Sequence, residues 1–246
     1  MLAPMDEALP RLEQWFDTPL GHALLGQERA AVGEALECVF GEEFLQVGAW
    51  GPPDLFLGLA RTQRRALLSA RGGVVGSIRS LPSALPIQSD SIDALLLPHT
   101  LELEADPHQV LREAGRVLRA EGCLVVVGFE PFGGWGLRGR VTAGGFPPGL
   151  DRLLSERRLA DWLKLLGFDV DPAHRFLYTL PLARAQAGRP KRWAEGAGRV
   201  FWPRLSGAYV LRARKRVYSV TPIRLHYRSR PAVLGGLAEP TTRVGT

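Results

Sequence analysis

The residues best placed for chemistry in this sequence follow apolar runs, at the points where buried strands would end. Residues 43–48 form a short run that leads into Gly48 and Trp50, and His99 stands two positions after the run at residues 91–97. Glycine at such a turn lets a ligand approach the backbone closely, although a strand-to-helix turn favours glycine in any case. His99 could act as a general base or position a substrate, because the pKa of histidine lies near neutrality. It could equally cap its strand by hydrogen bonding to backbone.

A third segment of this kind covers residues 128–136, which are rich in glycine and aromatic residues. Such a segment could form a lid over a bound substrate, or it could be a connection that packs its tryptophan. Because residues 131–150 as a whole are dense in Gly, Pro and Phe, we predict a loop there.

The sequence lacks the motifs of several other kinds of active site. The sequence contains no GxxxxGK[ST] phosphate loop, no GxSxG elbow and no HExxH pair. The five histidines show no ligand spacing, and Cys38 and Cys123 stand far apart, so we expect no metal site and a reducing compartment. The acidic N-terminus does not resemble a signal peptide, and the apolar runs are too short to span a bilayer. We therefore expect a cytoplasmic protein without membrane contact.

The positive charge is concentrated in the last third of the chain. Residues 1–174 hold 16 Lys and Arg against 23 Asp and Glu, whereas residues 175–246 hold 15 against 2. This asymmetry suggests an acidic partner, and nucleic acid could bind through Arg212, Arg214 and Arg216, which a strand would project from one face. The alternative is genome composition, since Arg outnumbers Lys 28 to 3.

Hydrophobic periodicity predicts alternating strands and helices. We predict helices over residues 18–40, 54–62, 106–122 and 155–166, and strands over residues 43–48, 65–69, 74–78, 91–97, 123–129, 170–178 and 208–218. This order predicts an α/β fold: a Rossmann-like, doubly wound, mostly parallel sheet with an antiparallel hairpin at one edge. We divide the chain into a helical segment at 1–41, the main domain at 42–227 and a disordered tail at 228–246.

Two stretches resemble a known family. Residues 89–97 read Ser-Asp-Ser-Ile-Asp-Ala-Leu-Leu-Leu, and residues 106–122 contain Val-Leu-Arg-Glu and then Arg-Val-Leu-Arg-Ala-Glu-Gly. Together with Ala-Leu-Pro-Ile at 84–87, they resemble class I S-adenosylmethionine-dependent methyltransferases of the type 11 kind. More narrowly, residues 46–51, 97–102 and 214–224 look like a group of uncharacterised proteobacterial methyltransferase-domain proteins.

The resemblance implies the class I methyltransferase fold and an S-adenosylmethionine site. It places Gly48 under the methionine moiety of the cofactor and the backbone after Pro82 near the adenine. The residues implied to bind the cofactor are Gln46, Gly48, Ala49, Trp50, Gly51, Ser69, Leu81, Pro82, Pro98 and His99, and His99 is also the candidate catalytic residue.

The sequence departs from the family pattern at two points. The family loop reads D-x-G-x-G-x-G, but Gln46 occupies the acidic position and Trp50 a glycine position. After the second strand the family carries Asp or Glu, whereas this sequence offers only Ser69 and Ser77. Loss of the charged, bidentate hydrogen bond to the ribose costs about 1.5–3 kcal/mol. Because Gln46, Trp50 and the missing ribose carboxylate all remove expected contacts, we expect weak cofactor binding. Trp50 either forms a wall of the pocket, which we favour, or fills the space of the cofactor's methionine end.

Two functional hypotheses follow. In the first, which we prefer, the protein transfers a methyl group from S-adenosylmethionine to an unidentified acceptor. In the second, the fold has lost turnover and serves as a binding or regulatory protein, contacting nucleic acid through its basic last third.

Overall fold

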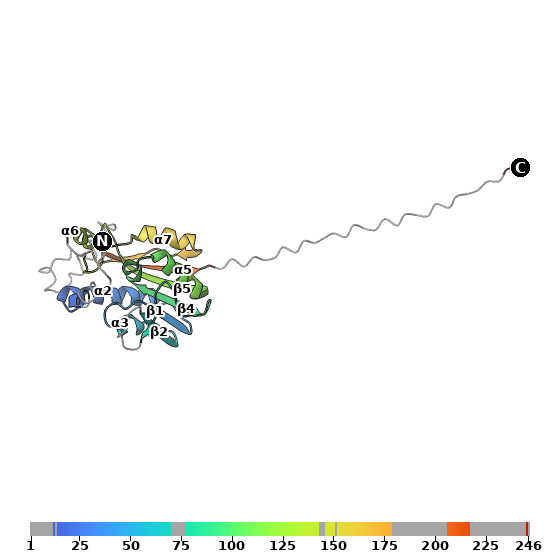
Figure 1. Cartoon of the computed structure of the whole chain (residues 1–246), viewed down its shortest axis with the longest axis horizontal. Helices are drawn as coiled ribbons and strands as arrows, with labels where there is room; N and C mark the ends of the chain where they lie inside the picture. Colours follow the sequence, from blue (N-terminus) through green and yellow to red (C-terminus); the bar gives the residue numbers. More distant parts are fainter. Residues whose placement is uncertain are drawn as a thin grey trace.

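The computed structural model describes residues 12, 14–69, 77–142, 146–150, 152–178, 206–216 and 245, with helices on both sides of one sheet (Figure 1). The strands are β1 (Glu43–Val47), β2 (Arg64–Ser69), β3 (Ser77–Arg79), β4 (Ile92–Pro98), β5 (Leu118–Phe129), β6 (Phe168–Val170), β7 (His174–Phe176) and β8 (Ala208–Lys215). The helices are α2 (Pro19–Leu36), α3 (Asp54–Leu57), α4 (Thr100–Leu103), α5 (Pro107–Val117), α6 (Gly134–Val141) and α7 (Glu156–Leu165).

The strands lie in the order β3-β2-β1-β4-β5-β8-β6, and β7 also pairs with β8. Strands β1 to β5 run parallel to one another, whereas β8 is antiparallel to β5, β6 and β7. This topology confirms the predicted doubly wound, mostly parallel sheet with an antiparallel part at one edge. The chain turns back between β1 and β4, because β2 and β3 extend the sheet in one direction and β4 and β5 in the other.

Each face of the sheet has its own hydrophobic core. Phe44 and Leu96 pack with α2, whereas Leu45 and Leu95 pack with α5 and α7. Successive residues of a strand point to opposite faces, so the continuous apolar runs of β1 and β4 supply both cores.

Helix α5 begins as its sequence predicts. The side chain of Asp106 accepts a hydrogen bond from the Gln109 N–H at 3.1 Å, and Pro107 is the first helical residue. At the other end, Arg116 forms an ion pair with Glu113 at 2.8 Å and donates to the Leu85 carbonyl at 2.9 Å. The helix therefore also fixes the segment that leads into β4.

Two predicted boundaries are wrong because tertiary pairing overrides local sequence preference. Helix α5 ends at Val117, not at Gly122, because Leu118 is already extended and pairs with Ile92 as the start of β5. The predicted loop at 131–150 contains α6, which is stabilised by burial of Trp135, 1% exposed, and not by its glycine-rich sequence.

Smaller differences have local causes. Helix α3 ends at Leu57 and not at residue 62, with Gly58 at its C-cap. The predicted strand at 170–178 is divided into β6 and β7, with Pro172, which has no N–H to donate, between them. Most of the strand predicted at 74–78 and the tail predicted at 228–246, residue 245 apart, fall outside the described residues. Among the described helices, none is long and apolar enough to cross a membrane.

Candidate functional site

The candidate site lies where the chain reverses direction, beyond the carboxyl ends of β1 and β4. A doubly wound sheet binds its ligands in the crevice at this position. Here the loop at 48–51 follows β1. The connection that follows β4 consists of His99 and the short helix α4, and we call residues 99–102 the second loop. The segment after Phe129, the last residue of β5, borders the same edge of the sheet.

The two loops touch each other directly. The Thr100 hydroxyl donates a hydrogen bond of 2.5 Å to the Val47 carbonyl. Gly48 has a φ of +98°, which side chains rarely adopt, and a Cβ there would lie 2.5 Å from Oγ1 of Thr100. Gly48 is therefore required for this close approach.

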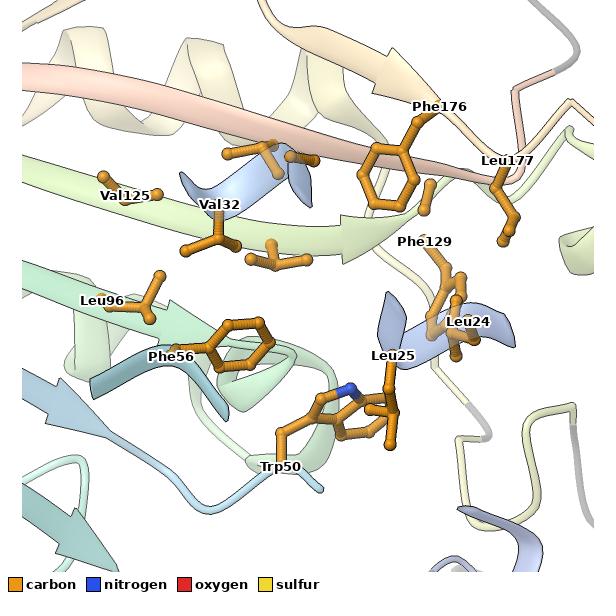
Figure 2. Packing of buried hydrophobic residues seen from close by; sticks show 14 of the residues in the cluster. Leu24, Leu25, Val32, Trp50, Phe56, Leu96, Val125, Phe129, Phe176 and Leu177 are labelled. Carbon is orange, nitrogen blue, oxygen red and sulfur yellow. The ribbon is translucent and has the colours of Figure 1, made fainter. Parts of the chain in front are cut away.

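Aromatic side chains fill the space in front of β1, β4 and β5. The indole of Trp50 lies over the His99 ring with centroids 4.1 Å apart, and His99 stacks on Phe129 at 4.3 Å. Phe16 and Trp135 extend this row at its two ends. Trp50 is 1% exposed, and Figure 2 shows it inside the buried cluster with Phe129 and Leu25 of α2.

A charged network runs through this aromatic row. One Glu28 oxygen accepts a hydrogen bond from Nε1 of Trp50 at 2.7 Å, and the other lies 2.9 Å from Nε2 of His99. On the opposite side of the ring, Nδ1 of His99 lies 2.7 Å from Glu102, which also accepts from the Phe129 N–H at 2.9 Å. Helix α2, both loops and the end of β5 are thereby joined.

The network sets unusual protonation equilibria. Burial by itself would lower the pKa of His99, but the charges and hydrogen bonds of Glu28 and Glu102 outweigh it and raise that pKa to about 9. Burial raises the pKa of Glu102, and its bonds to His99 and to backbone N–H groups offset only part of that. The imidazole is therefore held protonated between carboxylates, as a buried cation.

Gln46 is buried at the end of β1, 1% exposed. Its Nε2 donates to the Gly48 carbonyl at 3.1 Å, which fixes the amide orientation, and its Oε1 has no hydrogen-bond partner among the residues that the structure describes. It points to the α2 face, because it is two residues from Phe44 and paired in register with Leu96, which both belong to that core.

The structure gathers only some of the predicted site residues. Gln46, Gly48, Ala49, Trp50, Gly51, Pro98 and His99 lie around the crevice. Ser69 is buried at the end of neighbouring β2, and Leu81 and Pro82 follow β3, with Leu81 59% exposed. Their roles in binding stay predictions, as does a catalytic role for His99, whose side chain is fully buried.

Sequence reasoning missed Glu28 and Glu102. The signal for Glu28 was present, because a charged residue interrupts the buried stripe of α2 between Leu24 and Val32. Glu102 lies three residues after His99, which allows contact only if a helical turn follows β4, as α4 does.

Two of the three arginines predicted to bind nucleic acid have acidic neighbours, one in β8 and one directly after it. Arg212 forms an ion pair with Asp171 at 2.6 Å, and Arg216 pairs with Asp169 at 3.1 Å. Arg214 lies on the same strand face as Arg212 by its spacing. Nucleic-acid binding by these residues stays a prediction.

Comparison with known proteins agrees with the topology. A family profile described as a methyltransferase domain matches residues 58–126. The uncharacterised protein YafS of Escherichia coli is 31% identical over 211 residues, which cover 84% of this chain and 82% of YafS. A solved S-adenosylmethionine-dependent methyltransferase of Thermotoga maritima shares the fold, with a TM-score of 0.60, 17% identity, and coverage of 86% of this chain and 98% of that one. The chain belongs to the class I methyltransferase family.

A second solved structure, geranyl diphosphate methyltransferase in complex with S-adenosylmethionine, has a TM-score of 0.56 and 18% identity, covering 80% of this chain and 87% of that one. The methyltransferase family resemblance inferred from the β4–α5–β5 sequence is thus confirmed, and YafS bears out the narrower likeness to uncharacterised proteobacterial proteins. Gln46 and Trp50, the two residues that depart from the family's loop pattern, are both buried at the crevice.

Proposed function

We propose that this protein transfers a methyl group from S-adenosylmethionine to an acceptor that is still to be identified. The observation that carries the proposal is family membership, together with a glycine loop and a His99–Thr100 loop placed at the ligand crevice of the fold. Methyl transfer depends mainly on aligning donor, methyl group and nucleophile, so a reactive triad is not required.

The crevice as it stands does not fit the cofactor. Trp50 and His99 are 1% and 0% exposed and lie against each other, so the place in front of β1 and β4 is filled. The chain also offers an amide, Gln46, where the family has a carboxylate, and residues 65–77 contain no Asp or Glu for the ribose. Binding therefore requires movement of Trp50. We expected Trp50 to form a wall of an open pocket, but in this conformation its indole is buried and the pocket is closed.

A cleft beside α4 is the candidate binding place for the methyl acceptor. It has a volume of about 390 Å³ and lies between the start of α5 and α7. Leu101 and Leu154 line it together with Arg152 and Arg158, and the Arg158 guanidinium lies 5.0 Å over the ring of Trp162. Asp106 also lines the cleft, but the two guanidinium groups outnumber its carboxylate, so small amphipathic anions are the first acceptors to screen.

The test is calorimetric titration of the full chain with S-adenosylmethionine and with S-adenosylhomocysteine. We expect saturable binding of both with a Kd weaker than about 1 µM, since charged contacts are missing and Trp50 must move. Sub-micromolar binding would contradict the closed crevice. Absence of binding to either ligand at millimolar concentration would overturn the proposed function.

A further inference from the structure

The cleft beside α4 contains two guanidinium groups that have no ion pair with a described residue. Arg152 donates from Nη1 to the Ala105 carbonyl at 3.2 Å, and Arg158 makes neither a hydrogen bond nor an ion pair within the described part of the chain. Arginines elsewhere in the fold commonly face acidic side chains, as Arg119 does with Asp93 at 2.8 Å. Two unpaired positive charges in one cleft favour an anionic ligand.

The carboxylate that lines the cleft is already engaged. One oxygen of Asp106 accepts the Gln109 N–H at 3.1 Å and so caps α5. The other oxygen lies 4.0 Å from a guanidinium nitrogen of Arg112 on the same helix. Asp106 therefore stabilises the start of α5 and does not pair with either arginine of the cleft.

Aromatic rings hold the guanidinium of Arg158 in place. It lies 5.0 Å over the centroid of the Trp162 ring, and the His108 ring lies 3.8 Å from that of Trp162. Arg158 and Trp162 are four residues apart on α7, whereas His108 belongs to α5, so the three side chains connect the two helices. A guanidinium stacked on an aromatic ring loses less conformational freedom when it binds an anion.

The inner wall of the cleft is apolar. Leu101 and Leu154 line it and are 3% and 8% exposed, whereas both arginines are exposed at the rim. Leu101 stands next to Glu102 in the second loop, and the Leu154 N–H donates a hydrogen bond to the Glu102 carboxylate. The inner wall is therefore directly connected to the loop that borders the crevice.

We propose that the cleft is a binding site for a carboxylate with a compact apolar body. Arg158 and Arg152 bind the carboxylate at the rim, and the body lies against Leu101 and Leu154. A planar guanidinium group matches a carboxylate with two parallel N–H donors. The volume of about 390 Å³ lies in the usual range for small-molecule sites, roughly 300–1,000 Å³. A role of this acid as the methyl acceptor rests on the proposed function, whereas its binding does not.

The inference is tested by calorimetric titration of the full chain with three probes: 2-naphthoate, its uncharged amide 2-naphthamide, and inorganic phosphate. No cofactor is added, because the cleft is open while Trp50 closes the crevice. The variants are Arg158→Gln and Arg152→Gln, with Arg65→Gln as the matched control. Arg65 is exposed on β2, outside the cleft, and like Arg152 it donates to a backbone carbonyl, at 3.2 Å.

We expect naphthoate to bind saturably and at least about tenfold more tightly than naphthamide or phosphate. Arg158→Gln and Arg152→Gln should each weaken naphthoate about tenfold, because each removes a charged hydrogen bond, and Arg65→Gln should change its affinity less than about twofold. ¹⁹F NMR on the chain labelled with 5-fluorotryptophan locates the ligand. The signal that Trp162→Phe removes should shift with naphthoate.

Trp162 is a positioning residue, since it acts through Arg158. Trp162→Leu should weaken naphthoate about fivefold but leave naphthamide within about twofold, because the amide does not depend on a guanidinium. Trp162→Phe keeps an aromatic ring under Arg158 and should restore naphthoate binding to within about twofold of the parent. Equal weakening of naphthoate and naphthamide by Trp162→Leu would show that the ring only supports the fold.

Failure of this inference is distinguishable from failure of the proposed function. If naphthoate does not bind at millimolar concentration, if naphthamide or phosphate binds as tightly, or if Arg158→Gln weakens naphthoate no more than Arg65→Gln does, the carboxylate site is wrong. The proposed function then still stands on the titration with S-adenosylmethionine. Absence of S-adenosylmethionine binding together with the expected naphthoate results would overturn the proposed function and leave the carboxylate site in place.

Discussion

The two sides of the crevice are built in different ways. On the β4–α5–β5 side, each element follows from neighbouring residues: an apolar strand, a capped helix and a second apolar strand. On the α2–β1 side, the decisive contacts join residues distant in sequence, since Glu28 meets His99 at 2.9 Å across 71 positions. The family pattern is kept on the first side and altered on the second. The lesson is that a local pattern identifies a fold, whereas the state of its ligand site depends on a few long-range contacts.

The largest effect should come from removing the indole on the altered side. Trp50→Ala is expected to lower the free energy of unfolding by about 3–5 kcal/mol, as truncation of fully buried aromatic residues does. Urea denaturation followed by circular dichroism would measure it. The matched control is Trp162→Ala on α7, where the ring is only partly buried and the loss should be clearly smaller. Equal losses would mean that the aromatic row has no special role in the core.

A pH effect should follow from His99. Its pKa is about 9 in the folded protein against 6.5 when exposed, so its stabilisation is complete below pH 6.5 and is lost as pH rises through 9. The raised pKa of Glu102 acts in the same direction, because the folded state then binds a proton more tightly than the unfolded chain. Thermal unfolding should therefore show a Tm that falls between pH 6.5 and 9. A flatter curve is expected for Glu28→Gln, and a Tm that rises over this interval would contradict the buried imidazolium.

The capped helix on the β4–α5–β5 side predicts a moderate effect. Asp106→Ala removes the side-chain cap of α5 and should cost about 0.5–2 kcal/mol. The control, Asp161→Ala on the exposed face of α7, should stay within about 0.5 kcal/mol of the parent. The denaturation midpoints of the two variants measure the difference. An unchanged midpoint for Asp106→Ala would show that the side-chain cap of α5 does not contribute to stability.

The smallest effect is expected for nucleic acid. Because Arg212 and Arg216 already have acidic partners, replacing both by Ala should change affinity for single-stranded RNA or duplex DNA less than about twofold. Filter binding at 50 and 200 mM salt would measure it. A large loss together with a reduced salt slope would instead make the strand a phosphate-binding surface.

Particular residues show what the sequence could and could not predict. Asp106 and Pro107 mark the start of α5 because capping is a contact between residues three positions apart. Gly122 was misread as a helix end because pairing of Leu118 with Ile92 is not encoded locally. The glycine loop and His99 were placed at the crevice, since the topology brings strand ends together. Closure of the crevice was not predicted, because it depends on the long-range contacts of Glu28 with Trp50 and His99.

The tie between Glu28 and the centre of the sheet has a practical consequence for fragments. A fragment that begins at β1 would lack α2, so His99 would lose one of its two carboxylate partners and the core formed by Phe44 and Leu96 would lose its cover. Limited proteolysis in the native state should therefore spare the stretch from α2 to β1, and expression of the region from residue 42 onward should give insoluble material. Any minimal unit for crystallisation or for grafting must carry α2 with the sheet.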